Sequence, residues 1–345
     1  MISRSAANTA PDGGPLVTVT HPAPPAVSVC IPTYRRPQLL RRAVGSVFAQ
    51  TCEDWELLIS DDEDPPGETW GYLQHLARSD PRVRVMRNLG NHGQEPNMNN
   101  LLVQARGAWV KPLYDDDVLR PECLETLLSA VRGLSSVVLV SCLFDVYSDG
   151  KRTGSTPRRG RWPLQLIPQR YVHLGMYLQD CSIGAPTQVL VSRRAIEAGA
   201  LFQKTPGMVF FVDAWWSSLI VRHGDLLLVE KVLAEFHQGA HDTLTKRADE
   251  GMDAECPLVL GEELRYIDPR LNPPPLPVVV QMVKCLRAFH YLKLGKLAES
   301  FAILGQVRSP YAWLLLARWA LSRIFPGGFH VAPRIPVDEK GQTGR

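Results

Sequence analysis

Residues 27–34 are Val27-Ser28-Val29-Cys30-Ile31-Pro32-Thr33-Tyr34, a β-branched run that ends at a proline. Such a run predicts a buried strand. Apolar residues then fall at helical spacing from Pro37 to Gln50. The pattern continues with a strand at Trp55–Ile59, a helix at Glu68–Arg78, a strand at Val83–Met86, a helix at Asn99–Ala105 and a strand at Ala108–Val110. This order predicts an α/β fold with a mostly parallel sheet and helices on both of its faces.

Polar residues follow the ends of these strands. Thr33 and Tyr34 follow the first strand, Asp61 and Asp62 the second, and Asp115-Asp116-Asp117 the fourth. In an open α/β sheet, ligands bind outside the carboxyl ends of the strands. Three consecutive carboxylates repel one another unless a cation lies among them, and Mg²⁺ favours carboxylate oxygen. The triplet alone would suit a solvated acidic turn, but the three clusters together predict a ligand site.

The composition is that of an ordinary globular protein, with 45% hydrophobic and 21% charged residues among 345. Lys+Arg 38 against Asp+Glu 35 gives a charge of only +3, which offers no argument for a nucleic-acid partner. The seven cysteines include no Cys-x-x-Cys pair. A disulfide framework is therefore not expected, and the cysteines suit a protein of the reducing cytosol. No run of about 18 uncharged apolar residues predicts a transmembrane span.

The chain is expected to have four parts. They are a disordered, proline-rich segment 1–25, a sheet domain 26–256, a proline-rich linker with helices 257–330, and a disordered tail 331–345. The last helices are amphipathic, and Trp313–Phe325 combines aromatic residues with two arginines. We expect them to form a small appendage that packs on the main domain or on a homodimer partner. Peripheral contact with a membrane surface is the alternative.

Several motifs strongly resemble family 2 glycosyltransferases of the GT-A fold, over about residues 26 to 245. They are Val29–Arg36, Ser46–Thr51, Glu56–Asp62, Asn88-x-Gly90, Asn100, Ala105-x-Gly107 and Asp116-Asp117-x-x-x-Pro121. The resemblance implies a Rossmann-like sheet and an inverting enzyme that uses a nucleotide sugar.

The resemblance implies nucleotide-binding roles for the first two strand ends. Pro32, Thr33 and Tyr34 would line the nucleobase pocket, with Tyr34 stacked on the ring. Asp62 would accept from a base N–H group, with Asp61 as the alternative. Alternatively, Asp61 has no role in binding and is only a turn residue or a helix cap.

The resemblance implies further contacts with the donor, although this sequence departs from the family pattern at some of these positions. Arg35 stands where the family usually has asparagine, and Glu63-Asp64 where it has Gly-Ser; we keep Arg35 as a nucleotide-binding candidate. The amide-rich loop Asn88–Asn97 would bind the sugar and pyrophosphate, or would be a loop of turn formers. Just after this loop, Asn100 is the residue that we expect to bind the donor.

The acidic triplet resembles the family's Asp-x-Asp element. Asp115 and Asp117 are expected to hold Mn²⁺ or Mg²⁺, and Asp115 and Asp116 to contact the nucleotide, although which pair touches metal and which touches ribose stays open. His237 resembles the family histidine that helps to hold the metal and pyrophosphate, and His241 is the alternative. Neutral imidazole suits Mn²⁺ better than Mg²⁺.

Asp213 is the predicted catalytic base. It is a lone carboxylate in the apolar stretch Phe210–Trp216, where burial without a partner would be costly. Inverting transfer needs a base to take the acceptor's hydroxyl proton, and Asp213 falls where the family carries it. Capping the following helix is the structural alternative.

The segment Ser148–Arg161 is basic and rich in turn formers. It is expected to be a mobile, solvated loop. Closure over phosphates or an anionic acceptor is the alternative.

Together these features predict a cytoplasmic, metal-dependent glycosyltransferase. It would move a sugar, most often from a UDP sugar in such families, to an acceptor hydroxyl in polysaccharide, glycolipid or glycan assembly, at the cytoplasmic face of the membrane where the acceptor is a lipid. A nucleotidyltransferase would need a glycine-rich basic loop in place of Pro32-Thr33-Tyr34. A non-catalytic nucleotide-sugar or partner-binding protein is predicted to lack Asp213 or the triplet, and both are present.

Overall fold

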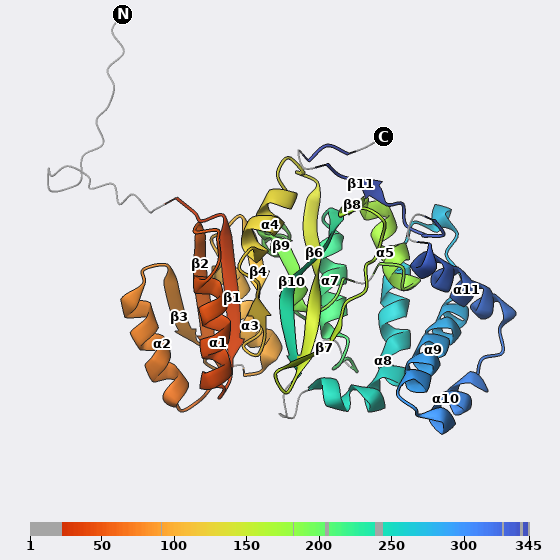
Figure 1. The fold of residues 1–345 in the computed structure, drawn as a ribbon, viewed down its shortest axis with the longest axis horizontal. Coiled ribbons are helices and arrows are strands. Elements are labelled where there is room, and N and C mark those ends of the chain that lie inside the picture. The colour runs from red at the N-terminus through yellow and green to blue at the C-terminus, as the bar shows by residue number, and fades with distance from the viewer. Residues whose placement is uncertain are drawn as a thin grey trace, which may run out of the picture.

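The computed structural model describes residues 23–90, 92–181, 183–203, 207–238, 244–325, 328–338 and 341–343. It has one sheet with helices on both faces, and a block of C-terminal helices beside the sheet (Figure 1). The strand order is β11-β8-β10-β6-β9-β4-β1-β2-β3. The α/β fold expected from the sequence is therefore confirmed.

The N-terminal half of the sheet is parallel, as predicted. Its strands are β1 (Val27–Thr33), β2 (Trp55–Asp61), β3 (Val83–Arg87) and β4 (Trp109–Pro112), and β1 pairs in parallel with both β2 and β4. The connecting helices are α1 (Pro37–Phe48), α2 (Glu68–Ser79) and α3 (Gln94–Gln104). Helix α3 begins within the amide-rich segment that was predicted to be a loop, so the second part of that segment is helical.

The second half of the sheet is mixed. It comprises β5 (Val118–Leu119), β6 (Val137–Ser148), β7 (Lys151–Ser155), β8 (Leu164–Ile167), β9 (Val189–Ser192), β10 (Asp225–Gln238) and β11 (Ile335–Pro336). Strand β9 joins the halves because it pairs antiparallel with both β4 and β6. The long strands β6 and β10 pair in parallel, and β10 also pairs antiparallel with β5 and β8.

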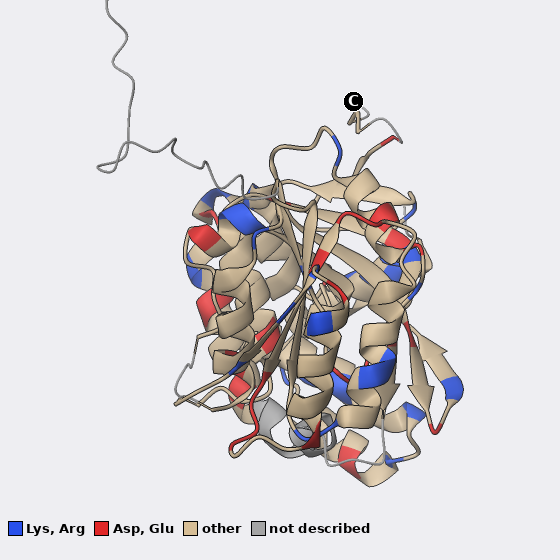
Figure 2. Cartoon of the chain, turned by 90° about the vertical axis from the view of Figure 1, so that its left-hand side faces the viewer, with Lys and Arg blue, Asp and Glu red and all other residues tan. Residues whose placement is uncertain are grey.

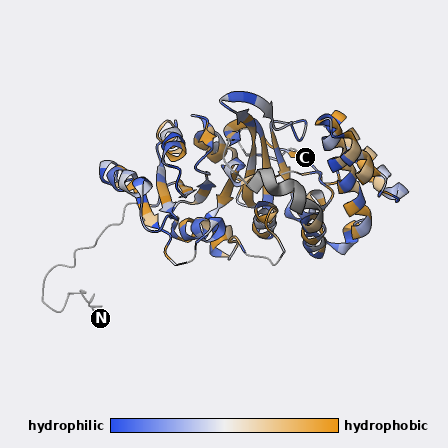
Figure 3. Cartoon of the chain, turned by 90° about the horizontal axis from the view of Figure 1, so that it is seen from below, coloured by the Kyte–Doolittle hydropathy of each residue, from blue (hydrophilic) through white to orange (hydrophobic). Residues whose placement is uncertain are grey.

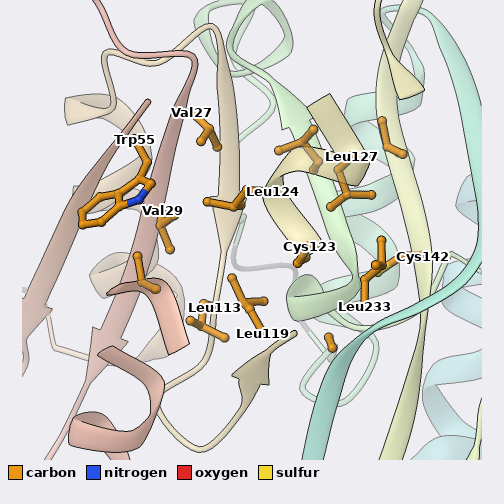
Figure 4. Close-up of a cluster of buried hydrophobic side chains, with 14 of the residues drawn as sticks. Val27, Val29, Trp55, Leu113, Leu119, Cys123, Leu124, Leu127, Cys142 and Leu233 are labelled. Carbon is orange, nitrogen blue, oxygen red and sulfur yellow. The ribbon is translucent and has the colours of Figure 1, made fainter. Parts of the chain in front are cut away.

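Alternate residues of the buried strands serve the two faces of the sheet. Val27 and Val29 of β1 belong to one apolar cluster, and Cys30 belongs to the cluster on the other face. Figure 4 shows Val27 and Val29 on the same side as Leu124 of helix α4 (Cys123–Ala130). Because successive side chains of a strand point to opposite faces, a strand that is apolar throughout can be buried on both.

The other face carries α3 and three helices of the second half. They are α5 (Gln169–Tyr177), α6 (Arg193–Glu197) and α7 (Val212–Val221), and the short turn η1 (Pro186–Gln188) precedes β9. Trp216 of α7 is fully buried there, stacked on Phe202 at 4.3 Å between ring centroids.

The C-terminal helices form a third apolar cluster beside the sheet. They are α8 (Leu244–Tyr266), η2 (Pro269–Leu271), α9 (Leu276–Lys293), α10 (Leu297–Leu304) and α11 (Pro310–Ile324). In α8, Val259 belongs to the sheet's cluster and the next residue, Leu260, belongs to the C-terminal one. The division expected at residue 257 thus lies inside a continuous helix, which joins the two clusters.

The C-terminal tail differs from the expectation of disorder. Within it, Ile335 and Pro336 pair with Leu166 and Gln165 of β8. Arg334 is buried and donates to the Asp180 carbonyl at 2.7 Å. The tail is ordered there because the edge of β8 offers it backbone partners. The predicted disorder of the N-terminal segment falls almost wholly outside the described residues.

The basic segment Ser148–Arg161 also differs from the expected mobile loop. Its first part is β7, paired with β6. Farther along, the Arg159 side chain is buried, with its Nε 3.1 Å from Glu230 Oε1 and an Nη atom donating to the Ser141 carbonyl at 2.8 Å. A buried ion pair with these hydrogen bonds holds the segment to the sheet.

Arg159→Met is expected to lower the free energy of unfolding by about 3–5 kcal/mol, because it leaves the Glu230 carboxylate buried without its partner. Urea denaturation measures the change. The matched control is Arg158→Met, since that neighbouring side chain is exposed, and it should change stability by less than about 0.5 kcal/mol. Equal effects from the two substitutions would contradict the structural role of Arg159.

No helix in the described part of the chain is long and apolar enough to cross a membrane. On the face shown in Figure 2, acidic and basic residues are interspersed along the helices.

Candidate active site

A cleft of about 1280 Å³ opens at the carboxyl ends of the parallel strands. Its wall includes eight of the twelve predicted site residues: Pro32, Thr33, Tyr34, Asp62, Asp115, Asp116, Asp213 and His237. Arg35, Asp61, Asn100 and Asp117 are not among the lining residues. Strand ends and a distant helix therefore meet in one cavity, large enough for a small-molecule ligand.

Two carboxylates of the triplet converge on one arginine at the cleft wall. Arg36 Nη1 lies 3.5 Å from Asp115 Oδ1 and 3.3 Å from Asp116 Oδ2. Asp115 Oδ2 also accepts from the Thr33 hydroxyl at 2.8 Å. Burial raises the pKa of Asp115 to about 6. The two carboxylates thus balance the positive charge of the Arg36 guanidinium group.

Asp117 has a different environment from its two neighbours. It is fully buried, with Oδ2 accepting from the Thr187 hydroxyl at 2.5 Å and Oδ1 accepting from the His237 backbone N–H at 3.2 Å. Burial raises its pKa to about 8. The side chain ties the turn after β4 to η1 and β10, below the cleft surface.

His237 lies near the end of β10, at the cleft wall. Its Nε2 is 3.3 Å from Glu235 Oε2, and its ring stacks on Tyr147 with centroids 5.0 Å apart. Burial, together with the positive charge of Arg42, lowers its pKa. A neutral imidazole is the form that binds metals. His241, the alternative, lies outside the described residues.

The residues present fit a divalent cation that is shared with a ligand. In the part of the chain that the structure describes, no three His, Cys, Asp or Glu side chains form a complete metal cluster. Asp115 and Asp116 nevertheless both contact one cationic nitrogen. Magnesium sites of this kind use one or two carboxylates and take their other ligands from phosphates and water.

Asp213 lies in the first turn of α7, at the cleft wall. Its Oδ1 accepts from the Tyr114 hydroxyl at 3.2 Å, and that hydroxyl in turn accepts from Gln94 Nε2 at 2.7 Å. Burial raises the pKa of Asp213 to about 6. The N-cap residue of α7 is Phe211, without a side-chain cap, so the capping alternative does not describe Asp213.

The start of α7 is held by a residue that the sequence did not single out. Glu255 of α8 accepts from the backbone N–H groups of Val209 at 2.9 Å, Phe210 at 2.7 Å and Phe211 at 3.1 Å. These contacts use both carboxylate oxygens and fix the segment that carries Asp213. No local sequence pattern links a glutamate in α8 to this turn.

Glu255→Gln is expected to lower the free energy of unfolding by about 1–3 kcal/mol, because a neutral amide cannot accept equally at both ends. Glu262→Gln, on the same helix and bonded only to Arg265 in the described contacts, is the control. Thermal unfolding of both variants tests the difference. A Glu255 variant as stable as the control would show that these hydrogen bonds contribute little.

The carboxylates after β2 are both engaged by neighbours. Asp62 accepts from Asn88 Nδ2 at 2.6 Å and the Gly93 N–H at 2.8 Å, and lies 3.0 Å from His92 Nδ1. Asp61 Oδ1 accepts from the Glu63 N–H at 3.1 Å, and among the described residues its buried Oδ2 has no partner. Asp62 thus holds the loop that contains Asn88, His92 and Gly93 at the cleft. Burial raises the pKa of Asp61.

Two residues predicted to bind the donor do not line the cleft, although near neighbours of each in the chain do. Arg35 turns away to pair with Glu63 at 3.1 Å, while Arg36 lines the cleft. Asn100 donates to the Ser60 hydroxyl at 3.2 Å, and Asn97, one helical turn earlier, lines the cleft instead. Tyr34, 49% exposed, stays available at the wall.

Comparisons with known proteins bear on the family and on the fold. Residues 28–199 match the model of the glycosyl transferase family 2. Over 123 residues the chain is 36% identical to the GalNAc(5)-diNAcBac-PP-undecaprenol beta-1,3-glucosyltransferase of Campylobacter jejuni, a match that covers 35% of this chain and 39% of that enzyme. Matches to three curated relatives cover 39%, 12% and 37% of their lengths.

Solved structures show the same fold. The chain superposes on S. aureus TarS 1-349 in complex with UDP-GlcNAc with a TM-score of 0.55 at 12% identity, covering 80% of this chain and 90% of that one. For the mannosyltransferase PcManGT of Pyrobaculum calidifontis in complex with GDP-Man and Mn²⁺, the TM-score is 0.51 at 17% identity, and the coverage is 87% and 81%. The matched residues include the strand ends that carry Asp62, Asp115 and Asp116, and residues 28–199 of this chain belong to glycosyl transferase family 2.

Proposed function

We propose that the protein is an inverting glycosyltransferase that moves a sugar from a nucleotide-sugar donor to an acceptor hydroxyl. One observation carries the proposal: Asp213 and the Asp115–Asp116 pair line the same cleft. A general base would activate the acceptor hydroxyl, and a cation held by the two carboxylates would balance the charge of the departing diphosphate. The complex of TarS with UDP-GlcNAc supports a UDP sugar as the donor.

The acceptor is proposed to be a glycan or glycolipid. The Campylobacter jejuni relative is named for a sugar chain on undecaprenyl diphosphate, which supports an acceptor of that chemical class. No disulfide joins any of the seven cysteines, all of which lie among the described residues, which supports the cytoplasmic location expected from the sequence.

In the proposed reaction, the Asp213 carboxylate takes the proton of the acceptor hydroxyl. The acceptor oxygen attacks the anomeric carbon as the bond from that carbon to the diphosphate oxygen breaks, with inversion. The Tyr114 hydroxyl, held by Gln94, orients the carboxylate. Tyr34 would stack on the base of the donor.

A divalent ion, Mn²⁺ or Mg²⁺, is proposed to be held by Asp115 and Asp116, with His237 at the same wall. When bound, it would neutralise charge on the departing diphosphate. Arg36, which contacts both carboxylates, would have to move aside for such an ion. Asp117, buried below them, would hold the turn in place.

Calorimetry with UDP, GDP, CDP and dTDP tests the proposed function. One diphosphate, expected to be UDP, should bind in the presence of Mn²⁺. EDTA should weaken binding at least tenfold, because an ion held by Asp115 and Asp116 would offset the charge of the diphosphate. If the folded protein binds none of the four, the nucleotide-sugar proposal fails, and a non-catalytic role with a partner protein takes its place.

A further inference from the structure

The C-terminal helices carry a charge unlike that of the rest of the chain. Residues 276–325 contain seven basic residues and one acidic residue, a formal charge of +6. The whole chain has +3, so the remainder carries −3. The basic residues are Lys284, Arg287, Lys293, Lys296, Arg308, Arg318 and Arg323, and the acidic one is Glu299.

The same helices expose apolar side chains. Helix α10 is made almost wholly of apolar residues, yet its one buried residue is Ser300, which donates to the Ala288 carbonyl of α9. Leu297 and Phe301, four residues apart on α10, are 57% and 65% exposed. Leu314 of α11 is 67% exposed. Figure 3 shows hydrophobic and hydrophilic segments side by side on these helices, at the right of the view.

Apolar and basic residues are interleaved on one short stretch. Lys293, Leu294, Lys296 and Leu297 follow one another around the turn from α9 to α10, and each is exposed. With Phe301 they form what we call the α10 surface. Neighbouring exposed apolar groups can serve as a contact site, and lysines beside them favour an anionic partner.

The positive charge and the projecting apolar side chains of the α10 surface distinguish between two possible partners, a second copy of the chain and a lipid bilayer. A second copy of the chain would bring its own basic helices to the surface, and like charges would repel. A bilayer accepts projecting leucine and phenylalanine side chains without a matching pocket, and anionic head groups pair with the lysines beside them. The charge therefore favours an anionic lipid surface.

We propose that the α10 surface docks the protein on an anionic phospholipid bilayer. The helices lie in the plane of the head groups, with Leu297 and Phe301 inserted and Lys293 and Lys296 on the phosphates. This docking goes beyond the proposed glycosyl transfer and does not depend on it.

The test is sedimentation of the full chain with vesicles of phosphatidylcholine alone, and of phosphatidylcholine mixed with phosphatidylglycerol. The protein should bind the anionic vesicles more tightly, and added salt should weaken that binding. The double variants Leu297→Glu/Phe301→Glu and Lys293→Glu/Lys296→Glu should each reduce partitioning at least about tenfold. Val103→Glu, on α3 and 61% exposed, should leave it unchanged.

Two results would overturn the proposal. One is a folded wild-type protein that does not bind the anionic vesicles, or double variants that both bind them as tightly as the wild type does. The other is light scattering that shows a dimer which Leu297→Glu/Phe301→Glu dissociates, without vesicle binding. Because the readout is partitioning, a failure of diphosphate binding would sink the proposed function and leave this result standing.

Discussion

Asp213→Asn is expected to lower kcat by about 10²–10⁴-fold, the contribution of a positioned general base. An asparagine keeps the size of the side chain and can still accept from Tyr114, but it cannot take a proton. Release of the nucleoside diphosphate from the donor sugar, with water or the acceptor as nucleophile, measures the rate. Binding of the diphosphate itself should persist, because Asp213 lies on the side of the cleft that faces the acceptor in the proposed reaction.

The pH dependence gives the same prediction a second readout. Burial raises the pKa of Asp213 to about 6, and only the deprotonated carboxylate acts as a base. The rate should therefore be level above about pH 7 and fall as the pH drops through 6. Tyr114→Phe removes a hydrogen bond that favours the charged carboxylate, so the fall should move to higher pH.

Asp54→Asn is the control, since that carboxylate is exposed and outside the cleft. It should retain wild-type rates at every pH. An Asp213→Asn enzyme that keeps more than about a tenth of the wild-type kcat would show that another group takes the proton.

Asp116→Asn is expected to weaken Mn²⁺-dependent binding of the diphosphate by at least about 100-fold. Loss of a group that only supports a metal ligand typically costs 10–100-fold, and Asp116 is proposed as a ligand itself. Its side chain lies at the cleft wall and shares Arg36 with Asp115. Calorimetry of the variant with and without EDTA measures the loss, and its thermal stability should stay close to that of the wild type.

Asp117→Asn should show the opposite pattern. Its carboxylate accepts from Thr187 and from the His237 backbone inside the protein, so the substitution should cost about 1–3 kcal/mol of stability. Diphosphate binding should persist at temperatures where the variant is folded. If Asp117→Asn abolishes binding and Asp116→Asn does not, the metal lies where the sequence placed it, between Asp115 and Asp117.

Much of the fold could be predicted because its signals are local. The apolar runs of β1 and β2 and the helical spacing from Pro37 depend only on burial and on the period of the backbone. The parallel pairing of the first four strands followed from the helix that connects each strand to the next. The meeting of Thr33, Tyr34, Asp62 and Asp115 in one cleft followed from where parallel strands end.

Only the tertiary structure decided which of two near neighbours reaches the cleft. Arg36 and Asn97 line it, whereas Arg35 and Asn100 were chosen from the sequence. Within the triplet, Asp116 lies at the wall and Asp117 below it. A shift of one residue in a turn, or of one turn in a helix, changes little in a sequence pattern, but it redirects the side chain.

Long-range contacts were also beyond the sequence. Glu255 reaches the start of α7, Glu230 pairs with Arg159, and β11 joins the sheet at β8. The sequence by itself determined the α/β fold, the strand ends and the residue types of the site. The tertiary structure decided which of those residues share the cleft, because their orientation depends on packing between segments far apart in the chain, and no local period records that packing.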